Sequence, residues 1–191
     1  MNKALFLDRD GVINVNHGYV YRTSEFDFMD GIFDLVQRAN GQGYKVIVVT
    51  NQSGIGRGMY TESDFEVLSA WMLCEFAMRG AIIDDVLFCP HYPQAKRQEY
   101  KKVCECRKSK AGMFKVAASK HNICLANSML VGDKLSDVEA AIEAGLSEVV
   151  WFNPEFIEPI QTSAAEFQAK SLSCELTSIT MSHSLWTIIT P

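Results

Sequence analysis

The sequence contains no hydrophobic run long enough to span a membrane and no signal-peptide pattern at its N-terminus. Its apolar stretches stay short of the roughly 18 residues that a membrane-spanning helix needs. A secretory leader would begin with basic residues, followed by an apolar segment and a small-residue cleavage site. We therefore expect a cytoplasmic protein without a membrane partner. Internal repeats and low-complexity linkers are also absent, which predicts one domain over residues 1–191.

The chain also has no excess of positive charge. Its 18 Lys and Arg residues stand against 23 Asp and Glu residues, for a formal net charge of −5. Proteins that bind nucleic acids usually present a basic face, so we expect no nucleic-acid partner. With 48% hydrophobic and 21% charged residues, the composition is that of a globular protein large enough to bury a full core. We expect a monomer whose partner is a small molecule.

Short apolar runs alternate along the chain with segments of helical spacing. Such alternation indicates right-handed βαβ units and a mostly parallel sheet, that is, an α/β fold. From about residue 153 the pattern weakens, and a helix over 164–170 and a final strand within 171–191 are the expectations there. The predicted strands cover residues 4–7, 45–49, 85–88, 128–131 and 148–152, and the predicted helices cover residues 32–40, 61–79, 111–121 and 137–144.

Two aspartates follow the first predicted strand directly. Residues two apart in an extended chain point the same way, so Asp8 and Asp10 should converge where the strand ends. In an open parallel sheet this edge is where ligands bind. Two carboxylates held so close need a cation or a proton to neutralise them. Taken alone, the pair could also be an acidic turn without a function.

Three further polar clusters stand at or just beyond predicted strand ends, and together they suit phosphoryl transfer. Asp133 adds a third hard oxygen ligand to Asp8 and Asp10, which predicts a Mg²⁺ site. Lys108 supplies a positive charge, and a carboxylate nucleophile beside a metal and a lysine suits an aspartyl-phosphate intermediate. Arg107 offers a bidentate fork for a second anion. Hydroxyl, amide and backbone donors for the phosphoryl group are offered by Thr50, Asn51 and Ser53.

The cysteines indicate a second metal. The segments Cys89-Pro90-His91 and Cys104-Glu105-Cys106 enclose a polar loop with little apolar content of its own. Three cysteines and one histidine form a closed tetrahedral Zn²⁺ set, and metal binding would supply the loop's folding energy. We expect structural zinc on Cys89, His91, Cys104 and Cys106. The alternative is a group of free buried thiols.

The order of these clusters resembles the four motifs of the haloacid dehalogenase (HAD) superfamily over residues 4–152. The resemblance implies a three-layer α/β/α, Rossmann-like fold with a mostly parallel sheet. It implies that Asp8 attacks phosphorus and that Asp10 acts as general acid and then as base. Thr50 and Lys108 would stabilise the transferring group, Asp133 would help to hold Mg²⁺, Asp137 would orient the site, and Lys134 would lie near the metal. The matching segments are Asp8-x-Asp10-Gly11-Val12, Thr50-Asn51, Lys108 and Gly132-Asp133-Lys134-x-x-Asp137.

Within that superfamily, the segments 8–14, 17–20, 50–58, the zinc loop and 106–108 resemble the D-glycero-D-manno-heptose 1,7-bisphosphate 7-phosphatase family. The resemblance implies removal of the C7 phosphate of a sugar bisphosphate, on the route to nucleotide-activated heptose for bacterial lipopolysaccharide or other surface polysaccharide. It also implies that no large cap domain is present and that the zinc-stapled loop over residues 89–106 shapes the pocket. The substrate-binding residues that it implies are Asn16, His17, Gly18, Tyr19, Thr50, Asn51, Gln52, Ser53, Arg57, Arg107 and Lys108.

The sequence departs from this family at Asn16, where an acidic residue is frequent, and after Lys108, where a proline-containing turn is usual. Both departures leave the sugar and its anomer open. Histidinol-phosphate phosphatase, a zinc-loop relative, is the alternative activity, and a catalytically silent zinc-stabilised binding module is the alternative of another class. His17 has the alternative of a loop cap, and Arg57 and Lys134 that of surface charges. The basic stretch over residues 96–102 is a solvated face that could attract a doubly phosphorylated substrate.

Overall fold

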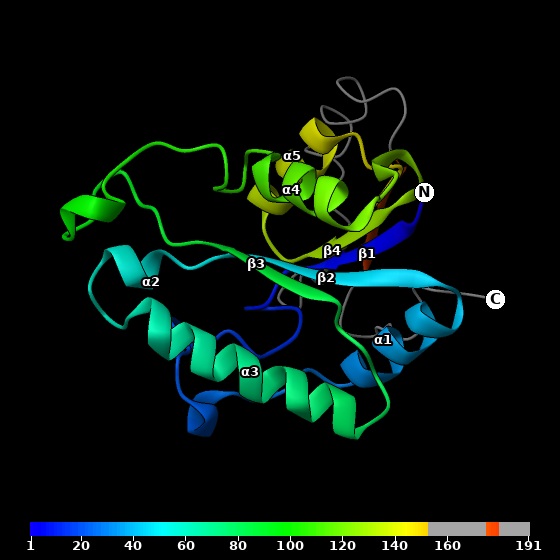
Figure 1. Cartoon of the computed structure of the whole chain (residues 1–191), viewed down its shortest axis with the longest axis horizontal. Helices are drawn as coiled ribbons and strands as arrows, with labels where there is room; N and C mark the ends of the chain where they lie inside the picture. Colours follow the sequence, from blue (N-terminus) through cyan, green and yellow to red (C-terminus); the bar gives the residue numbers. More distant parts are fainter. Residues whose placement is uncertain (153–174, 180–191) are drawn as a thin grey trace.

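The computed structural model describes residues 1–152 and 175–179, and a parallel sheet forms its centre (Figure 1). The described strands run in the order β3-β2-β1-β4-β5-β6, and every pairing between them is parallel. The strand order reverses where β1 lies between β2 and β4, and in open α/β sheets ligands bind at such a point. The strands are β1 (Lys3–Leu7), β2 (Tyr44–Asn51), β3 (Asp85–Cys89), β4 (Met129–Gly132), β5 (Glu148–Phe152) and β6 (Glu175–Ile179).

Helices cover both faces of the sheet. In Figure 1, α1 (Ile32–Gly41) and α3 (Glu62–Met78) lie below the strands, while α4 (Gly112–His121) and α5 (Leu135–Ala144) lie above them. This arrangement confirms the predicted three-layer α/β/α fold with a parallel sheet. None of the described helices has the length and apolar character that a bilayer crossing requires. The short helices are α2 (Ser53–Gly56), η1 (Thr23–Glu25), η2 (Gln98–Tyr100) and η3 (Leu125–Asn127).

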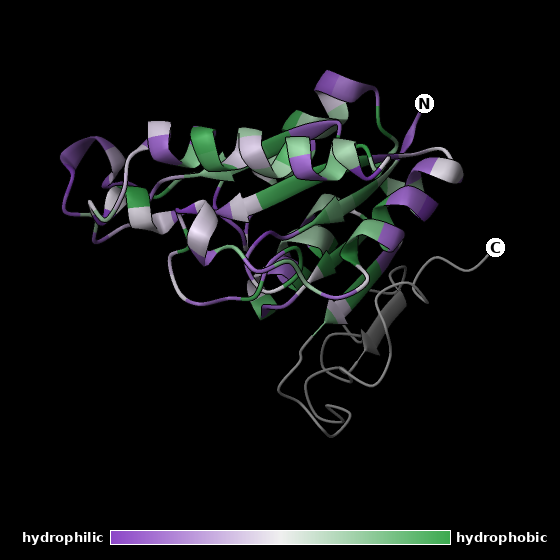
Figure 2. Ribbon diagram, turned by 90° about the horizontal axis from the view of Figure 1, so that it is seen from below, coloured by the Kyte–Doolittle hydropathy of each residue, from purple (hydrophilic) through white to green (hydrophobic). Residues whose placement is uncertain are grey.

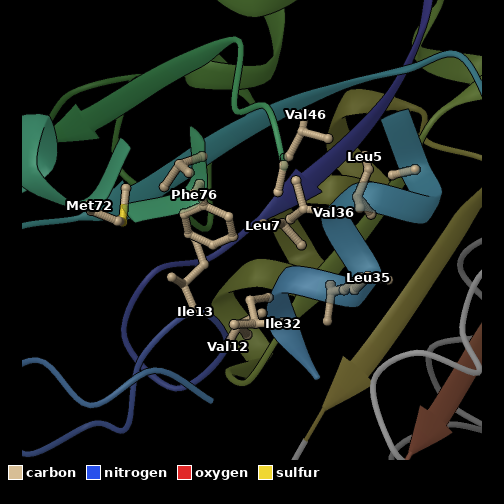
Figure 3. Close-up of a cluster of buried hydrophobic side chains, with 14 of the residues drawn as sticks. Leu5, Leu7, Val12, Ile13, Ile32, Leu35, Val36, Val46, Met72 and Phe76 are labelled. Carbon is tan, nitrogen blue, oxygen red and sulfur yellow. The ribbon is translucent and has the colours of Figure 1, made fainter. Parts of the chain in front are cut away.

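The alternation of side chains along β1 explains why both faces are covered. Leu5 and Leu7 point into the core shared with α1 and α3, where Figure 3 shows them beside Leu35 and Phe76. Ala4 and Phe6 point the other way, into the core shared with α4 and α5. A continuous apolar strand is typical of a parallel sheet buried on both sides. Figure 2 accordingly shows hydrophobic residues along the strands and hydrophilic residues on the outer surfaces.

Most predicted elements are present, with small shifts at their ends. The predicted helix over 61–79 is α3, and Thr61 and Asp64 form a capping box at its start. The helix predicted over 137–144 begins earlier, at Leu135, since the carboxylate of Asp137 accepts a hydrogen bond from the Lys134 amide and closes the first turn. α2 has no counterpart in the prediction. β6 lies within the segment where a final strand was predicted, and the helix predicted over 164–170 lies outside the described residues.

Candidate active site

The polar clusters at the strand ends come together around one cavity. Asp8 and Asp10 follow β1, Thr50 and Asn51 end β2, and Asp133 follows β4. The cavity has a volume of about 340 Å³ and stands over the point where the strand order reverses. Its lining residues are Asp8, Asp10, Asn16, Gly18, Tyr19, Thr50, Asn51, Gln52, Ser53, Tyr60, Arg107, Lys108, Lys134, Ser136 and Asp137.

Lys108 lines the cavity, and its ammonium group contacts three oxygen acceptors. Its ammonium group lies 2.9 Å from Asp8 Oδ1 and 2.8 Å from Asp137 Oδ1, and it donates to the carbonyl of Val49 at 2.6 Å. Burial alone would raise the pKa of Asp8, but the charges of Lys108 and Lys134 outweigh it and hold that pKa below its usual value. Asp8 is therefore ionised, as a carboxylate nucleophile must be.

Oxygen atoms of Asp8, Asp133 and Asp10 converge around the ammonium group of Lys134. Lys134 Nζ lies 3.6 Å from Asp8 Oδ2, 3.1 Å from Asp133 Oδ1 and 3.2 Å from the main-chain oxygen of Asp10. Burial and the charge of Asp8 raise the pKa of Asp133 to about 7, because the carboxylates repel one another. Three hard oxygens with surplus negative charge fit Mg²⁺. Gly11, at a φ of 102°, leaves room for the Asp133 carboxylate, since a Cβ at position 11 would lie 2.2 Å from Asp133 Oδ2.

The carboxylate of Asp10 points away from these oxygens and is held separately. It accepts from Arg9 Nη2 at 2.7 Å, from Gln52 Nε2 at 3.1 Å and from Asn14 Nδ2 at 3.2 Å. The predicted magnesium ligand Asp10 thus offers its main-chain oxygen toward Asp8 and Asp133, while its side chain faces the cavity beside Thr50. This separation leaves the Asp10 carboxylate available for proton transfer.

Arg9 contacts the site directly, and the prediction did not name it. Its side chain is 1% exposed, contacts both carboxylate oxygens of Asp10 and donates to the carbonyl of Val20. The rings of Phe26 and Phe65 lie about it, at 6.0 and 5.6 Å from the guanidinium carbon. In an extended chain the side chain of Arg9 points to the opposite side from those of Asp8 and Asp10. Nothing in the sequence shows that its guanidinium group nevertheless contacts the Asp10 carboxylate.

The polar side chains at the end of β2 and just after it are hydrogen-bonded to one another or to Lys108. Gln52 Nε2 donates to Thr50 Oγ1 at 2.9 Å, and its amide oxygen accepts from the hydroxyl of Tyr60 at 2.6 Å. Asn51 holds Lys108 by its backbone, accepting from its amide at 3.0 Å and donating to its carbonyl at 2.8 Å. Tyr60 and Ser136 are further lining residues that the prediction did not name. Ser136 occupies an unspecified position within the motif Gly132-Asp133-Lys134-x-x-Asp137, and Tyr60 comes just after the segment 50–58.

The predicted sugar-binding residues are divided between two cavities. Asn16, Gly18 and Tyr19 line the cavity of Asp8. His17 lines a neighbouring cavity of about 520 Å³, which shares Gly18 and Tyr19, and its ring lies 2.7 Å from Asp27 Oδ2. Arg57 lines neither cavity and packs with its guanidinium carbon 4.0 Å from the centre of the Tyr92 ring.

The four predicted zinc ligands are close together at the base of the loop that follows β3. The sulfur atoms of Cys89, Cys104 and Cys106 are 3.2 to 3.5 Å apart, and His91 Nδ1 lies 3.2 Å from Cys106 Sγ. Such spacings are much longer than a disulfide bond of about 2.05 Å. They approach the edges of about 3.8 Å in a tetrahedron with Zn–S bonds of about 2.3 Å. The donor set and its geometry therefore fit Zn²⁺.

Comparison with known proteins supports the fold and the phosphatase site described above. A family model described as "HAD-hyrolase-like" matches residues 105–151. D-glycero-beta-D-manno-heptose-1,7-bisphosphate 7-phosphatase of Escherichia coli strain K12 is 43% identical over 171 residues, which cover 89% of this chain and 90% of the relative. The chain belongs to this phosphatase family. The Vibrio cholerae member is 47% identical over 143 residues, 75% of this chain and 77% of the relative.

Solved structures of this family share the fold. The D,D-heptose 1,7-bisphosphate phosphatase from B. bronchiseptica, complexed with magnesium and phosphate, matches with a TM-score of 0.75 and 25% identity. That match covers 97% of this chain and 95% of the other. The Burkholderia thailandensis enzyme matches with a TM-score of 0.57, 25% identity and the same coverage. The chain is therefore a HAD-superfamily phosphatase, as its motifs predicted.

Proposed function

We propose that the protein hydrolyses the C7 phosphate of D-glycero-D-manno-heptose 1,7-bisphosphate, on the route to nucleotide-activated heptose for bacterial surface polysaccharide. The observation that carries the proposal is the cavity at the strand-order reversal, where ionised Asp8 lies 2.9 Å from Lys108 and beside a separately held Asp10. Relatives that share 43% identity over nine-tenths of their length and carry the heptose phosphatase name support the choice of substrate.

The proposed chemistry has two steps. Asp8 attacks phosphorus, the bond between phosphorus and the C7 oxygen breaks, and Asp10 donates a proton to that oxygen. Asp10 then accepts a proton from water, which attacks the aspartyl-phosphate, releases inorganic phosphate and restores the Asp8 carboxylate. Arg9, Gln52 and Asn14 hold the Asp10 carboxylate in place through both transfers.

Thr50 and Lys108 would stabilise the charge on the transferring group. Asn51 fixes the backbone of Lys108, and Asp137 and Val49 fix its ammonium group, so the charge is preorganised rather than moved into place. Preorganised charge in a water-poor site is worth far more than the same charge in solvent.

The metal ligands follow from the donor atoms. Asp8, Asp133 and the main-chain oxygen of Asp10 would hold Mg²⁺, which when bound neutralises charge on the phosphoryl oxygens. Cys89, His91, Cys104 and Cys106 would hold Zn²⁺, and four protein ligands leave no open position for chemistry. Zinc is therefore proposed to be structural.

A substrate panel on purified enzyme tests the proposal. With magnesium present, the highest kcat/KM is expected for one anomer of the heptose bisphosphate, and Asp8→Asn should abolish turnover without altering the far-UV circular dichroism spectrum. A higher kcat/KM for histidinol phosphate would assign the alternative substrate. Turnover of no phosphate monoester would instead favour the silent binding module, and near-normal activity of Asp8→Asn would refute the nucleophile.

The proposal also covers the cellular compartment and the oligomeric state of the enzyme. We propose that it acts in the cytoplasm, because thiols reserved for zinc persist in a reducing compartment. We also propose that it is a monomer. Light scattering during size-exclusion chromatography tests the monomer, which for this chain has a mass of 21.4 kDa.

A further inference from the structure

Arg107 lines the active-site cavity and Arg57 lies beside the lining residue Tyr19, and among the described residues no carboxylate pairs with either guanidinium. Within residues 1–152, the ion pairs do not include Arg57 or Arg107, whereas Arg9, Arg22 and Arg79 each pair with an acidic side chain. Arg57 Nε is buried and makes no hydrogen bond. A guanidinium that is neither paired nor freely solvated is a donor set available to an anion.

Both guanidinium groups are placed against one aromatic ring. The guanidinium carbon of Arg57 lies 4.0 Å from the centre of the Tyr92 ring, and that of Arg107 lies 5.8 Å from the same centre. Arg57 also lies 5.8 Å from the ring of Tyr19. The order Tyr19, Arg57, Tyr92, Arg107 therefore forms a row, and its first and last members line the cavity of Asp8.

The row joins three segments that are far apart in the sequence. Tyr92 follows the zinc ligand His91, and Arg107 follows the ligand Cys106 and donates to the carbonyl of His91 at 3.2 Å. The loop is fixed on α2, next to Arg57, by the Lys96 amide, which donates to the Gly56 carbonyl at 2.9 Å. In Figure 1 this loop extends past the end of β3 and lies beside α2.

We propose that Tyr92 is a specificity-determining residue, which positions Arg57 and Arg107 for a second phosphate of the substrate. The inference rests on the proposed function, in which the substrate is a bisphosphate. An aromatic face attracts a guanidinium without cancelling its charge, whereas a carboxylate would fix the same group and neutralise it. Two positioned and still charged forks, Arg107 in the cavity lining and Arg57 next to it, are therefore available to a phosphate that Asp8 does not attack. Tyr92 acts through the two arginines and does not itself touch the reacting atoms.

The test compares Tyr92→Ala with Tyr92→Phe on heptose 1,7-bisphosphate and on heptose 7-phosphate, which lacks the second phosphate. Tyr92→Ala should raise the KM for the bisphosphate about tenfold, with kcat nearly unchanged, because two cation–π contacts are lost. Its KM for the monophosphate should change less than about twofold, and Tyr92→Phe, which keeps the ring, should behave as wild type. Tyr44→Ala is the matched control, since Lys3 lies 3.9 Å from that ring at the opposite end of the sheet.

Zinc content, measured by mass spectrometry on each variant, separates positioning from folding of the loop. Equal KM increases on both substrates, a Tyr92→Phe variant as impaired as Tyr92→Ala, or loss of zinc from Tyr92→Ala would each overturn the proposal. Turnover of the bisphosphate by the wild-type enzyme tests the proposed function separately from the role of Tyr92. If it does not turn over the bisphosphate, that function fails; if it prefers the bisphosphate and Tyr92→Ala keeps the preference, the role of Tyr92 alone fails.

Discussion

Replacing Lys108 by methionine should destabilise the protein through the two carboxylates that it leaves behind. The side chain is 1% exposed, and its ammonium contacts Asp8, Asp137 and the Val49 carbonyl at 2.6 to 2.9 Å. Removing one partner of a buried ion pair typically costs about 3–5 kcal/mol, because the remaining charge is uncompensated. Since a domain of this kind is stable by roughly 5–15 kcal/mol, Lys108→Met should still fold, with about 4 kcal/mol less stability.

The companion variant Asp137→Asn isolates the cause. Burial raises the pKa of Asp137 even beside Lys108, so its ionised form is already costly. Once the lysine is gone, neutralising position 137 should relieve part of the repulsion with Asp8. We expect Lys108→Met/Asp137→Asn to recover about 2 kcal/mol relative to Lys108→Met, as coupled neighbours do.

Urea unfolding without added magnesium, followed by circular dichroism, measures these differences. The pH dependence has a definite sign. Without Lys108, burial would raise the folded-state pKa of Asp8 above its ordinary value of 3.8, so the loss should be larger at pH 8 than at pH 5. A loss below about 1 kcal/mol, or a double variant whose loss is the sum of the single losses, would refute this account of the site.

Three other predictions concern the metals. Because the pKa of Asp133 is raised to about 7, a proton competes with Mg²⁺ below that value; calorimetry should show the affinity falling as pH drops from 7 to 6 and staying level above 8, and a flat profile would contradict it. Gly11→Ala should abolish magnesium binding because its Cβ would strike Asp133, while Gly43→Ala, equally left-handed but with open space around it, should bind normally. Cys104→Ser should lose the single zinc of the wild-type chain, and exposed Cys74→Ser should retain it; equal zinc in both would exclude the four-ligand site.

The sequence was sufficient for the elements and for the residue types of the site. The short apolar run from Ala4 to Leu7 and the apolar runs within β2, β4 and β5 predicted buried strands, because they are too short for helices and are bounded by polar turn residues. The same is true of the motif residues. Asp8 and Asp133 are 125 positions apart, yet each directly follows a strand, so parallel strands must gather them at one edge. Lys108 instead comes after the loop that follows β3, and contacts with Asn51 and Asp137 hold it in the site.

The orientation of individual groups depended on contacts between distant segments. That Asp10 turns its main-chain oxygen toward Asp133 and its carboxylate toward Arg9 follows from the burial of Arg9 against Phe26 and Phe65. No local pattern specifies such a contact. α2 was missed for a related reason, since a single turn at 53–56 has too few residues to show helical periodicity.

The chain by itself therefore determined which chemistry the site performs, because the reacting groups are fixed by residue type and by their place after strands. The tertiary structure decided which neighbours tune them: Arg9 on Asp10, Asp137 on Lys108, and Tyr92 between two unpaired arginines. Whether a residue directly follows a strand is a local property of the sequence, and the geometry of the strand then places that residue at the edge of the sheet. The direction in which a long side chain packs depends on the whole fold, because only the assembled core fixes the space that remains for it.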